Sequence, residues 1–300
     1  MSFFEVYNPV FRSYVLGNAP VKQLASGFAW VEGPVWFGDA GCLLFSDIPN
    51  NKVLRWSPGG AGVSTFRSPS NFSNGHARDR QGRLISCEHG TRRVTRTELD
   101  GSITVIADRF EGKRLNSPND VIVKSDGTIW FSDPHYGIMT DYEGARAEQE
   151  LPCNVYRTDP QTGRIEAVVT DVLGPNGLAF SPNEDRLYLA DTGRMFGDDP
   201  THIRAFDCSS SGVLRGGDVL HSIAPGMADG LRVDTDGNIW SSAADGVHCI
   251  SPEGELLGKI LVPETVSNLC FGGRARHQLF ITASTSLYAV SLNRQGARLL

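Results

Sequence analysis

The sequence predicts an all-β fold, namely a single six-bladed β-propeller whose blades are four-stranded antiparallel sheets. Three observations carry this prediction. A motif of two short alternating strands joined by a polar turn occurs six times along the 300 residues. Successive copies lie 42, 45, 57, 53 and 39 residues apart, a spacing typical of a four-stranded blade. No segment maintains the 3.6-residue apolar period of a long amphipathic helix.

The six copies are aligned on one anchor position in the first strand of each. The anchors are Gly33, Gly75, Asp120, Gly177, Gly230 and Leu269. The copies read VEGPVWFGDAGCLLFSD (31–47), FSNGHARDRQGRLISCE (72–88), SPNDVIVKSDGTIWFSD (117–133), GPNGLAFSPNEDRLYLADT (174–192), MADGLRVDTDGNIWSSA (227–243) and VSNLCFGGRARHQLFITA (266–283).

Candidates for the two outer strands of a blade follow each copy. Third strands begin at residues 52, 93, 154, 202, 246 and 286, and a short apolar stretch behind each supplies a fourth strand. Residues 297–300 (ARLL) are the last of these stretches, and residues 20–30 (PVKQLASGFAW) can complete the same blade from the N-terminal side. Closure by this N-terminal strand would protect the free sheet edges of the ring. Residues 1–300 then form one domain, with residues 1–20 as an N-terminal extension.

A polar residue precedes the anchor in all six copies. These residues are Glu32, Asn74, Asn119, Asn176, Asp229 and Asn268. Asn and Asp are common in turns, which is the simplest explanation of the column. The hairpin turns, however, lie later in each copy, and Glu is a poor turn former. Because the innermost strand of each blade lines the central channel, we expect these six residues to form a ring that faces it.

Such a ring favours a bound cation. Two carboxylates near one axis repel each other and lose hydration unless a positive charge lies between them. Carboxylate and amide oxygens suit one hard divalent ion. The several amide carbonyls favour Ca²⁺, with Mg²⁺, Mn²⁺ and Zn²⁺ as alternatives that these ligands also accept.

Two long connections are expected on the same face as the ring. They are residues 134–153 and 192–201, and long irregular loops in a compact domain are typically lids or binding loops. Asp133, His135 and Tyr136 lie at the base of the first, either as substrate-binding residues or as structural anchors of the loop. The sequence thus predicts a pocket for a small molecule beneath these lids.

Composition and motif searches exclude several other functions. A net charge of −6 without a basic run disfavours nucleic acid as a partner. No apolar run approaches the ~18 residues of a membrane span, and the N-terminus lacks the pattern of a signal peptide. Six scattered cysteines are typical of reduced, mostly buried thiols, so a cytoplasmic location is expected. Motifs of serine hydrolases, nucleotide-binding proteins and zinc proteases do not occur.

Six motifs are specific in combination: EGPVW (32–36), LLFSDIPNNKVLRW (43–56), NSPNDV (116–121), PNGLAFS (175–181), ADGLRVDTDGNIW (228–240) and CFGG (270–273). Together they resemble the SMP-30/gluconolactonase/LRE family, which includes regucalcin and bacterial gluconolactonases, from about residue 27 to 292. The resemblance implies a six-bladed propeller with one catalytic divalent metal ion at the channel mouth. The family pattern places the metal ligands at Glu32, Asn176 and Asp229, and Asn119 near metal and substrate.

The typical activity of this family is the hydrolysis of sugar lactones such as D-glucono-1,5-lactone, and its aspartate ligand is usually proposed as general base. That residue is Asp229 here. The stretch GKRLNSPND (112–120) departs from the animal members and is of the bacterial type. The substrate-contacting Arg of the family therefore has no certain counterpart here, and Arg114 is only a candidate for that role.

A cyclic ester requires a polarised carbonyl, a water aimed at the carbonyl carbon and stabilisation of the oxyanion. A divalent ion can supply the first and third as a Lewis acid. Asp229 could accept the proton of the water, and a hydroxide held by the ion is the alternative base. Asn74 and Asn119 are candidates for hydrogen bonds to the sugar hydroxyls or to the lactone oxygen.

Two other functions stay open from the sequence. The same site could hydrolyse another lactone, an aryl ester or an organophosphate, or the propeller could be a non-catalytic interaction scaffold. An interaction scaffold needs no acid–amide cluster in its channel, so we expect a lactonase. Blade edges commonly support homodimers in such folds, and the sequence leaves the oligomeric state open.

Overall fold

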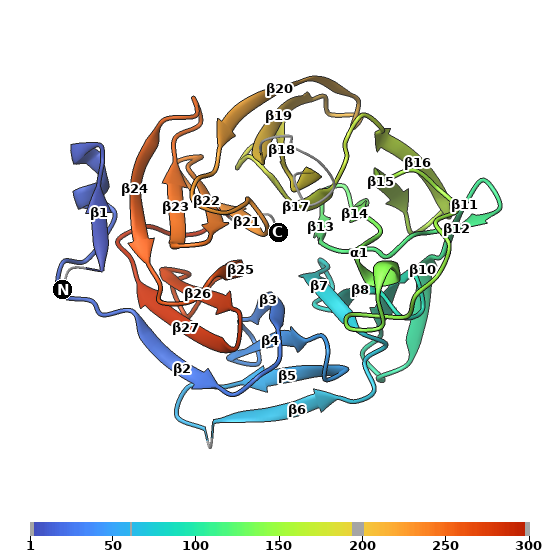
Figure 1. The fold of residues 1–300 in the computed structure, drawn as a ribbon, viewed down its shortest axis with the longest axis horizontal. Helices are drawn as coiled ribbons and strands as arrows, with labels where there is room; N and C mark the ends of the chain where they lie inside the picture. The colour runs from blue at the N-terminus through green and yellow to red at the C-terminus, as the bar shows by residue number, and fades with distance from the viewer. Residues whose placement is uncertain (1–2, 61, 194–200, 298–300) are drawn as a thin grey trace.

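Six sheets surround a central channel in the computed structural model, which describes residues 3–60, 62–193 and 201–297. Figure 1 looks down the channel axis, with β3, β7, β13, β17, β21 and β25 nearest to the centre. Each of these sheets is antiparallel, and its strands follow the chain outwards from the axis, apart from an N-terminal strand at the outer edge of two sheets. The predicted six-bladed all-β propeller is therefore confirmed.

The strands of the first three blades run from the inside outwards. Blade one contains β3 (Val31–Phe37), β4 (Cys42–Asp47), β5 (Lys52–Trp56) and β6 (Val63–Arg67). Blade two contains β7 (Ser73–Arg78), β8 (Leu84–Glu88), β9 (Arg93–Thr97) and β10 (Ile103–Ala107). Blade three contains β13 (Val121–Val123), β14 (Ile129–Asp133), β15 (Asn154–Asp159) and β16 (Arg164–Val169). The small hairpin of β11 (Arg109–Phe110) and β12 (Lys113–Arg114) connects blades two and three.

Of the remaining blades, blade four follows the same order, and blades five and six each add a strand from the N-terminal region. Blade four contains β17 (Pro175–Phe180), β18 (Arg186–Asp191), β19 (His202–Cys208) and β20 (Leu214–Ser222). Blade five contains β21 (Leu231–Val233), β22 (Ile239–Ala243), β23 (Gly246–Ile250), β24 (Leu256–Leu261) and β1 (Phe4–Val6). Blade six contains β25 (Val266–Gly272), β26 (Gln278–Ala283), β27 (Ser286–Ser291) and β2 (Lys22–Ser26).

Burial differs between the strands of a blade in the way the sequence pattern indicates. Every residue of the second strands β4, β8, β14 and β22 is buried. The outer strand β6, by contrast, contains no fully buried residue. The inner strands β17 and β25 are buried along their whole length, although each contains polar residues.

The ring closes through an N-terminal strand, as predicted. β2 pairs with β27, with Lys22 opposite Ala289 and Ser26 opposite Ser286. β2 is thus the outermost strand of blade six, a position for which residues 297–300 were also a candidate. Ala297 instead donates its N–H to Val233 O in blade five, at 2.8 Å, and residues 298–300 lie outside the described residues.

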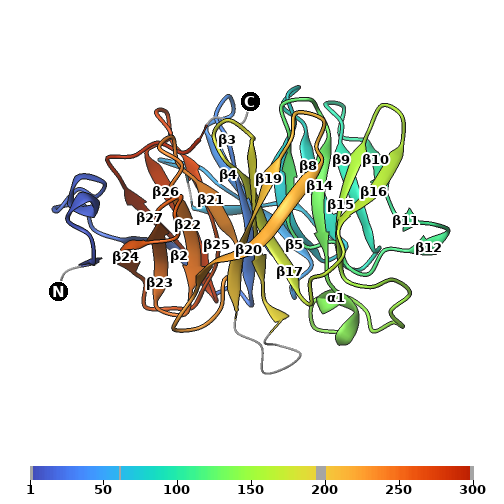
Figure 2. The ribbon, with the colours of Figure 1, turned by 90° about the horizontal axis from the view of Figure 1, so that it is seen from above.

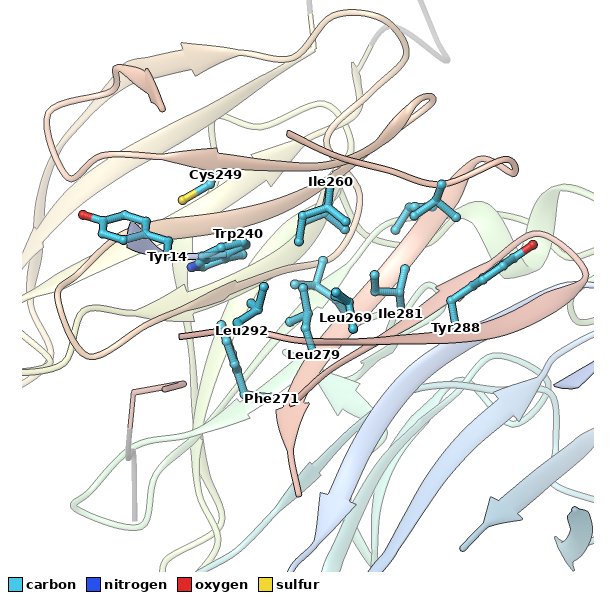
Figure 3. Close-up of a cluster of buried hydrophobic side chains, with 14 of the residues drawn as sticks. Tyr14, Trp240, Cys249, Ile260, Leu269, Phe271, Leu279, Ile281, Tyr288 and Leu292 are labelled. Carbon is cyan, nitrogen blue, oxygen red and sulfur yellow. The ribbon is translucent and has the colours of Figure 1, made fainter. Parts of the chain in front are cut away.

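The N-terminal extension packs against blade five. β1 adds a fifth strand to β24, and the 3-10 helix η1 (Pro9–Ser13) inserts Phe11, which is completely buried. The ring of Phe11 lies 6.1 Å from that of Trp240, and a Cβ on Gly258 would be 2.1 Å from Phe11. Figure 3 shows Tyr14, Trp240 and neighbouring residues of this cluster between blades five and six.

The two faces of the disc carry different connections. The short helix α1 (Tyr136–Met139), in the connection from β14 to β15, projects from one face (Figure 2). The hairpin between β17 and β18 turns at the opposite end of these strands, where Ser181 donates to Asp185 at 2.7 Å. Within the described residues, no helix has the length and apolar character needed to span a bilayer. All six cysteines are buried and none forms a disulfide, which confirms the prediction of buried thiols.

Candidate active site

The predicted ring lies where the inner strands of neighbouring blades approach each other most closely. Backbone hydrogen bonds cross between blades at this level, from Gly75 N to Asn119 O at 2.8 Å and from Gly177 N to Asp229 O at 3.0 Å. A Cβ on Gly177 would lie only 2.3 Å from Asp229 O. The glycine after Asn176 is therefore required by the approach of the next blade, and a hairpin turn plays no part.

A cavity of about 420 Å³ opens at this level on the face that carries α1. It brings together five of the six ring residues and Tyr136, a substrate-binding candidate of the first lid. These are Glu32, Asn74, Asn119, Asn176, Asp229 and Tyr136. The sixth ring residue, Asn268, lies behind them and donates from Nδ2 to Glu32 Oε2 at 3.0 Å. The remaining wall is largely apolar and includes Trp30, Met227 and Val266.

Burial disfavours the charged form of both ring carboxylates, and the charge of Glu32 adds to this at Asp229. Burial raises the pKa of Glu32 to about 8, against hydrogen bonds from Asn268 and from Gly33 N at 2.6 Å. Part of the Asp229 side chain stays accessible from the cavity. Desolvation by the surrounding protein, followed by repulsion from Glu32, nevertheless raises the pKa of Asp229 well above its ordinary value.

The carboxylate oxygens of Glu32 and Asp229 fit a divalent cation, because a positive charge between them would offset both the desolvation and the repulsion. A further amide oxygen of the cavity, Asn74 Oδ1, is buried and has no hydrogen-bond partner in the described part of the chain, so it is left for a bound ligand. No three His, Cys, Asp or Glu side chains of residues 3–60, 62–193 and 201–297 form a metal-binding group. The site would thus be of the mixed carboxylate–amide kind that the sequence predicts.

A fixed positive charge lies directly behind the ring. Arg232 Nη1 is 3.2 Å from Asp120 Oδ2, and both side chains are largely buried. Asp120 is the first of the charges that raise the pKa of Arg232, and Glu32 is another. Arg232 therefore compensates part of the negative charge of the ring from the side of a second cavity, of about 630 Å³, at the opposite mouth of the channel.

Thr192 connects the two lids above Asn176. Its Oγ1 lies within hydrogen-bond distance of the Tyr136 hydroxyl and accepts from Asn176 Nδ2 at 3.4 Å. The Thr192 hydroxyl also donates to Gly174 O at 3.0 Å. The base of the second predicted lid thus holds the amide of Asn176, whereas residues 194–200 of that lid lie outside the described residues.

Glu143 is a cavity residue that sequence reasoning missed. It lies in the first lid, lines the cavity, and its pKa is raised by burial. Its charge is also among the causes that raise the pKa values of Glu32 and Asp229. The only signal in the sequence was its place in an insertion expected to overhang an acidic ring, and nothing distinguished it from the other acidic residues of that insertion.

Three predicted substrate-binding residues lie outside the cavity lining. Asp133 is completely buried and accepts from Asn116 N at 2.8 Å, and burial raises its pKa to about 7. His135 Nδ1 is 3.2 Å from the sulfur of Cys153. Arg114 donates to a backbone carbonyl, Thr91 O, at 3.1 Å. Asp133 thus anchors the connection before blade three, which is neither the pocket nor the loop 134–153 for which the sequence proposed it.

Comparison with known proteins agrees with the geometry. The family model described as SMP-30/gluconolactonase/LRE-like region matches residues 30–285. A gluconolactonase of Zymomonas mobilis is 32% identical over 93% of this chain and 83% of its own length. The pentonolactonase XacC of Haloferax volcanii is 30% identical over 84% of this chain and 81% of its own. The structure of a Xanthomonas campestris gluconolactonase superposes with a TM-score of 0.90 at 37% identity, covering 96% of this chain and 94% of that one.

Proposed function

The chain belongs to the SMP-30/gluconolactonase/LRE-like family, and on that premise we propose that it hydrolyses the ester bond of a sugar lactone, converting D-glucono-1,5-lactone to gluconate. The observation that carries the proposal is the convergence of Glu32, Asn176 and Asp229 in one cavity at the channel mouth. A channel that served only as a scaffold would have no reason to desolvate two carboxylates beside each other.

Glu32, Asn176 and Asp229 would hold one divalent cation, for which Ca²⁺ matches the mixed carboxylate and amide oxygens best. When bound, this ion supplies Lewis acidity that polarises the lactone carbonyl and stabilises the oxyanion. The excess of negative charge around the cavity, to which Glu143 contributes, favours the binding of such an ion.

Asp229 acts as the general base. Its carboxylate lines the cavity, so it can accept a proton from a water that attacks the carbonyl carbon. The bond between the carbonyl carbon and the ring oxygen then breaks, and the ring oxygen leaves with a proton as a hydroxyl group. One lactone and one water thus yield one hydroxy acid.

The walls of the cavity suit a sugar ring. Asn74 and Asn119 offer amide groups to the hydroxyl edge of the ring, and Tyr136 lies on the lid above. Trp30 and Met227 form an apolar wall against which the C–H face of the ring can pack. A cavity with one polar and one apolar wall binds and orients such a molecule.

The test combines metal analysis with a pH-drop assay on D-glucono-1,5-lactone. The dialysed protein is expected to retain about one equivalent of divalent metal and to release acid from the lactone. Excess EDTA should abolish this activity, and added Ca²⁺ should restore it. Acid release that is unchanged in EDTA would refute the role of the cation. A metal-loaded protein without lactonase activity would refute the substrate.

A further inference from the structure

His89 connects the first lid to the ring, although it is not among the residues that line the cavity. It follows β8 in blade two and is completely buried. Its Nδ1 lies 3.0 Å from the backbone carbonyl oxygen of Glu143 in the lid. Its Nε2 lies 3.4 Å from Nδ2 of Asn74 in β7. The imidazole thus joins a cavity residue of the lid to a cavity residue of the ring.

The two contacts determine how the Asn74 amide is oriented. A carbonyl oxygen only accepts hydrogen bonds, so Nδ1 of His89 carries the proton, and Nε2 of the neutral ring is then an acceptor. Asn74 consequently presents its Nδ2 to His89 and turns Oδ1 away. That Oδ1 has no hydrogen-bond partner within the described residues. An acceptor on a cavity-lining residue is therefore left for a donor from outside the protein.

Close packing makes this arrangement depend on the position of the lid. Gly137 of α1 lies against the imidazole, and a Cβ at this position would be 2.5 Å from His89 Cγ. The N–H of Gly137 also donates to Ser117 Oγ at 2.9 Å, which fixes α1 above blade three. A shift of α1 would therefore displace His89 and, with it, the partner of the Asn74 amide.

We propose that His89 is a positioning residue that seats the lid through Glu143 O and, at the same time, directs Asn74 Oδ1 towards a hydroxyl group of the bound sugar lactone. The identity of the bound molecule rests on the function proposed above. The contact between His89 and the lid does not depend on it, so the two can be tested separately.

Two conservative variants separate the two contacts. H89N places an amide near the position of Nδ1, so it still donates to Glu143 O but no longer reaches Asn74. H89Q extends to the position of Nε2 and keeps a partner for Asn74, but it loses the contact with the lid. H76Q is the matched control. His76 is 1% exposed and lies in the same blade, but its ring nitrogens contact two serine hydroxyls at 2.8 and 2.9 Å.

The variants are compared by steady-state kinetics with D-glucono-1,5-lactone and by hydrogen exchange of the peptide covering residues 134–153. H89N is expected to raise KM roughly tenfold, the value of one lost hydrogen bond, with kcat nearly unchanged and lid exchange as in the wild type. H89Q is expected to speed lid exchange with a smaller effect on KM. Adding H89N to N74A should cause no loss beyond that of N74A alone, because His89 acts through Asn74.

Three results would overturn the inference. Lid exchange in H89Q that equals lid exchange in H76Q would exclude the lid contact, whatever the enzyme hydrolyses. A KM of H89N equal to that of H76Q would exclude an effect on the substrate. Independent, additive losses for H89N and N74A would show that His89 does not act through Asn74. If the wild-type protein leaves the lactone intact, the proposed function fails, whereas the exchange comparison still decides the role of His89 towards the lid.

Discussion

Replacing Glu32 by glutamine should stabilise the cation-free protein at alkaline pH. Burial raises the pKa of Glu32 from an ordinary 4.5 to about 8. Between these two pH values the folded protein keeps a proton that the unfolded chain releases, so the stability of the folded state falls as the pH rises from about 4.5 to about 8. The amide in E32Q would be neutral throughout, and its oxygen can still accept from Gly33 and Asn268.

The size of the effect follows from the same values. A pKa raised from 4.5 to about 8 corresponds to at most about 5 kcal/mol of lost stability at pH 8. At pH 5 the loss is roughly 1 kcal/mol or less. At about 2 °C per kcal/mol for a protein of this size, the Tm of E32Q relative to wild type should rise by up to about 8 °C between pH 5 and pH 8.

The assay is thermal unfolding in EDTA at pH 5, 6.5 and 8, followed by circular dichroism. The control is E148Q, because Glu148 is an exposed glutamate in the first lid. Ca²⁺ at about a thousandfold its Kd should stabilise the wild type by about 4 kcal/mol at pH 8, and E32Q by much less. A difference between E32Q and wild type that does not change with pH would refute the argument, as would a larger pH effect in E148Q.

Three further changes test the remaining parts of the site. D229N should lower kcat by roughly 10²- to 10⁴-fold, as for loss of a general base; near-normal turnover with metal still bound would exclude that role. G33A should destabilise the protein by more than about 3 kcal/mol in urea unfolding, since its Cβ would lie 2.0 Å from a neighbouring backbone oxygen at φ +54°. G41A, at φ +59° in open space, should cost only about 1 kcal/mol. T192V removes the hydroxyl that holds the Asn176 amide and should lower lactone kcat/KM about tenfold. Because this hydroxyl also donates to Gly174 O and contacts the Tyr136 hydroxyl, Tm should fall as well; an unchanged kcat/KM beside a lowered Tm would indicate a structural role only.

The positions of the ring residues were predictable because the propeller repeats one local pattern. Glu32 and Asp229 lie almost 200 residues apart, yet each precedes an anchor at the start of an inner strand. Equivalent positions of a closed ring lie at one depth around the axis. Alignment of the six copies was therefore enough to predict that these residues lie close together. The same alignment failed for Asn268, whose amide supports Glu32 from behind instead of lining the cavity.

The limits of the sequence are clearest at the end of the second strands. Asp133 follows the same repeat logic as the ring and was expected near the pocket, but its carboxylate accepts backbone N–H groups of the preceding connection. Asp47 and Asp191 do the same in blades one and four, at 3.1 and 3.0 Å. A repeated acidic residue can thus satisfy a repeated backbone need, and sequence alone does not separate this role from that of a ligand.

By itself, the sequence determined the six blades, the closure by an N-terminal strand and the acid–amide ring, because each depends on a local period repeated at equivalent places. Only the tertiary structure decided which residues meet that ring from outside the repeat. Glu143, Thr192 and His89 reach it through loops without a period, and their partners lie between 15 and 56 residues away along the chain. Such contacts depend on how irregular segments pack over a finished scaffold, which no spacing within the sequence encodes.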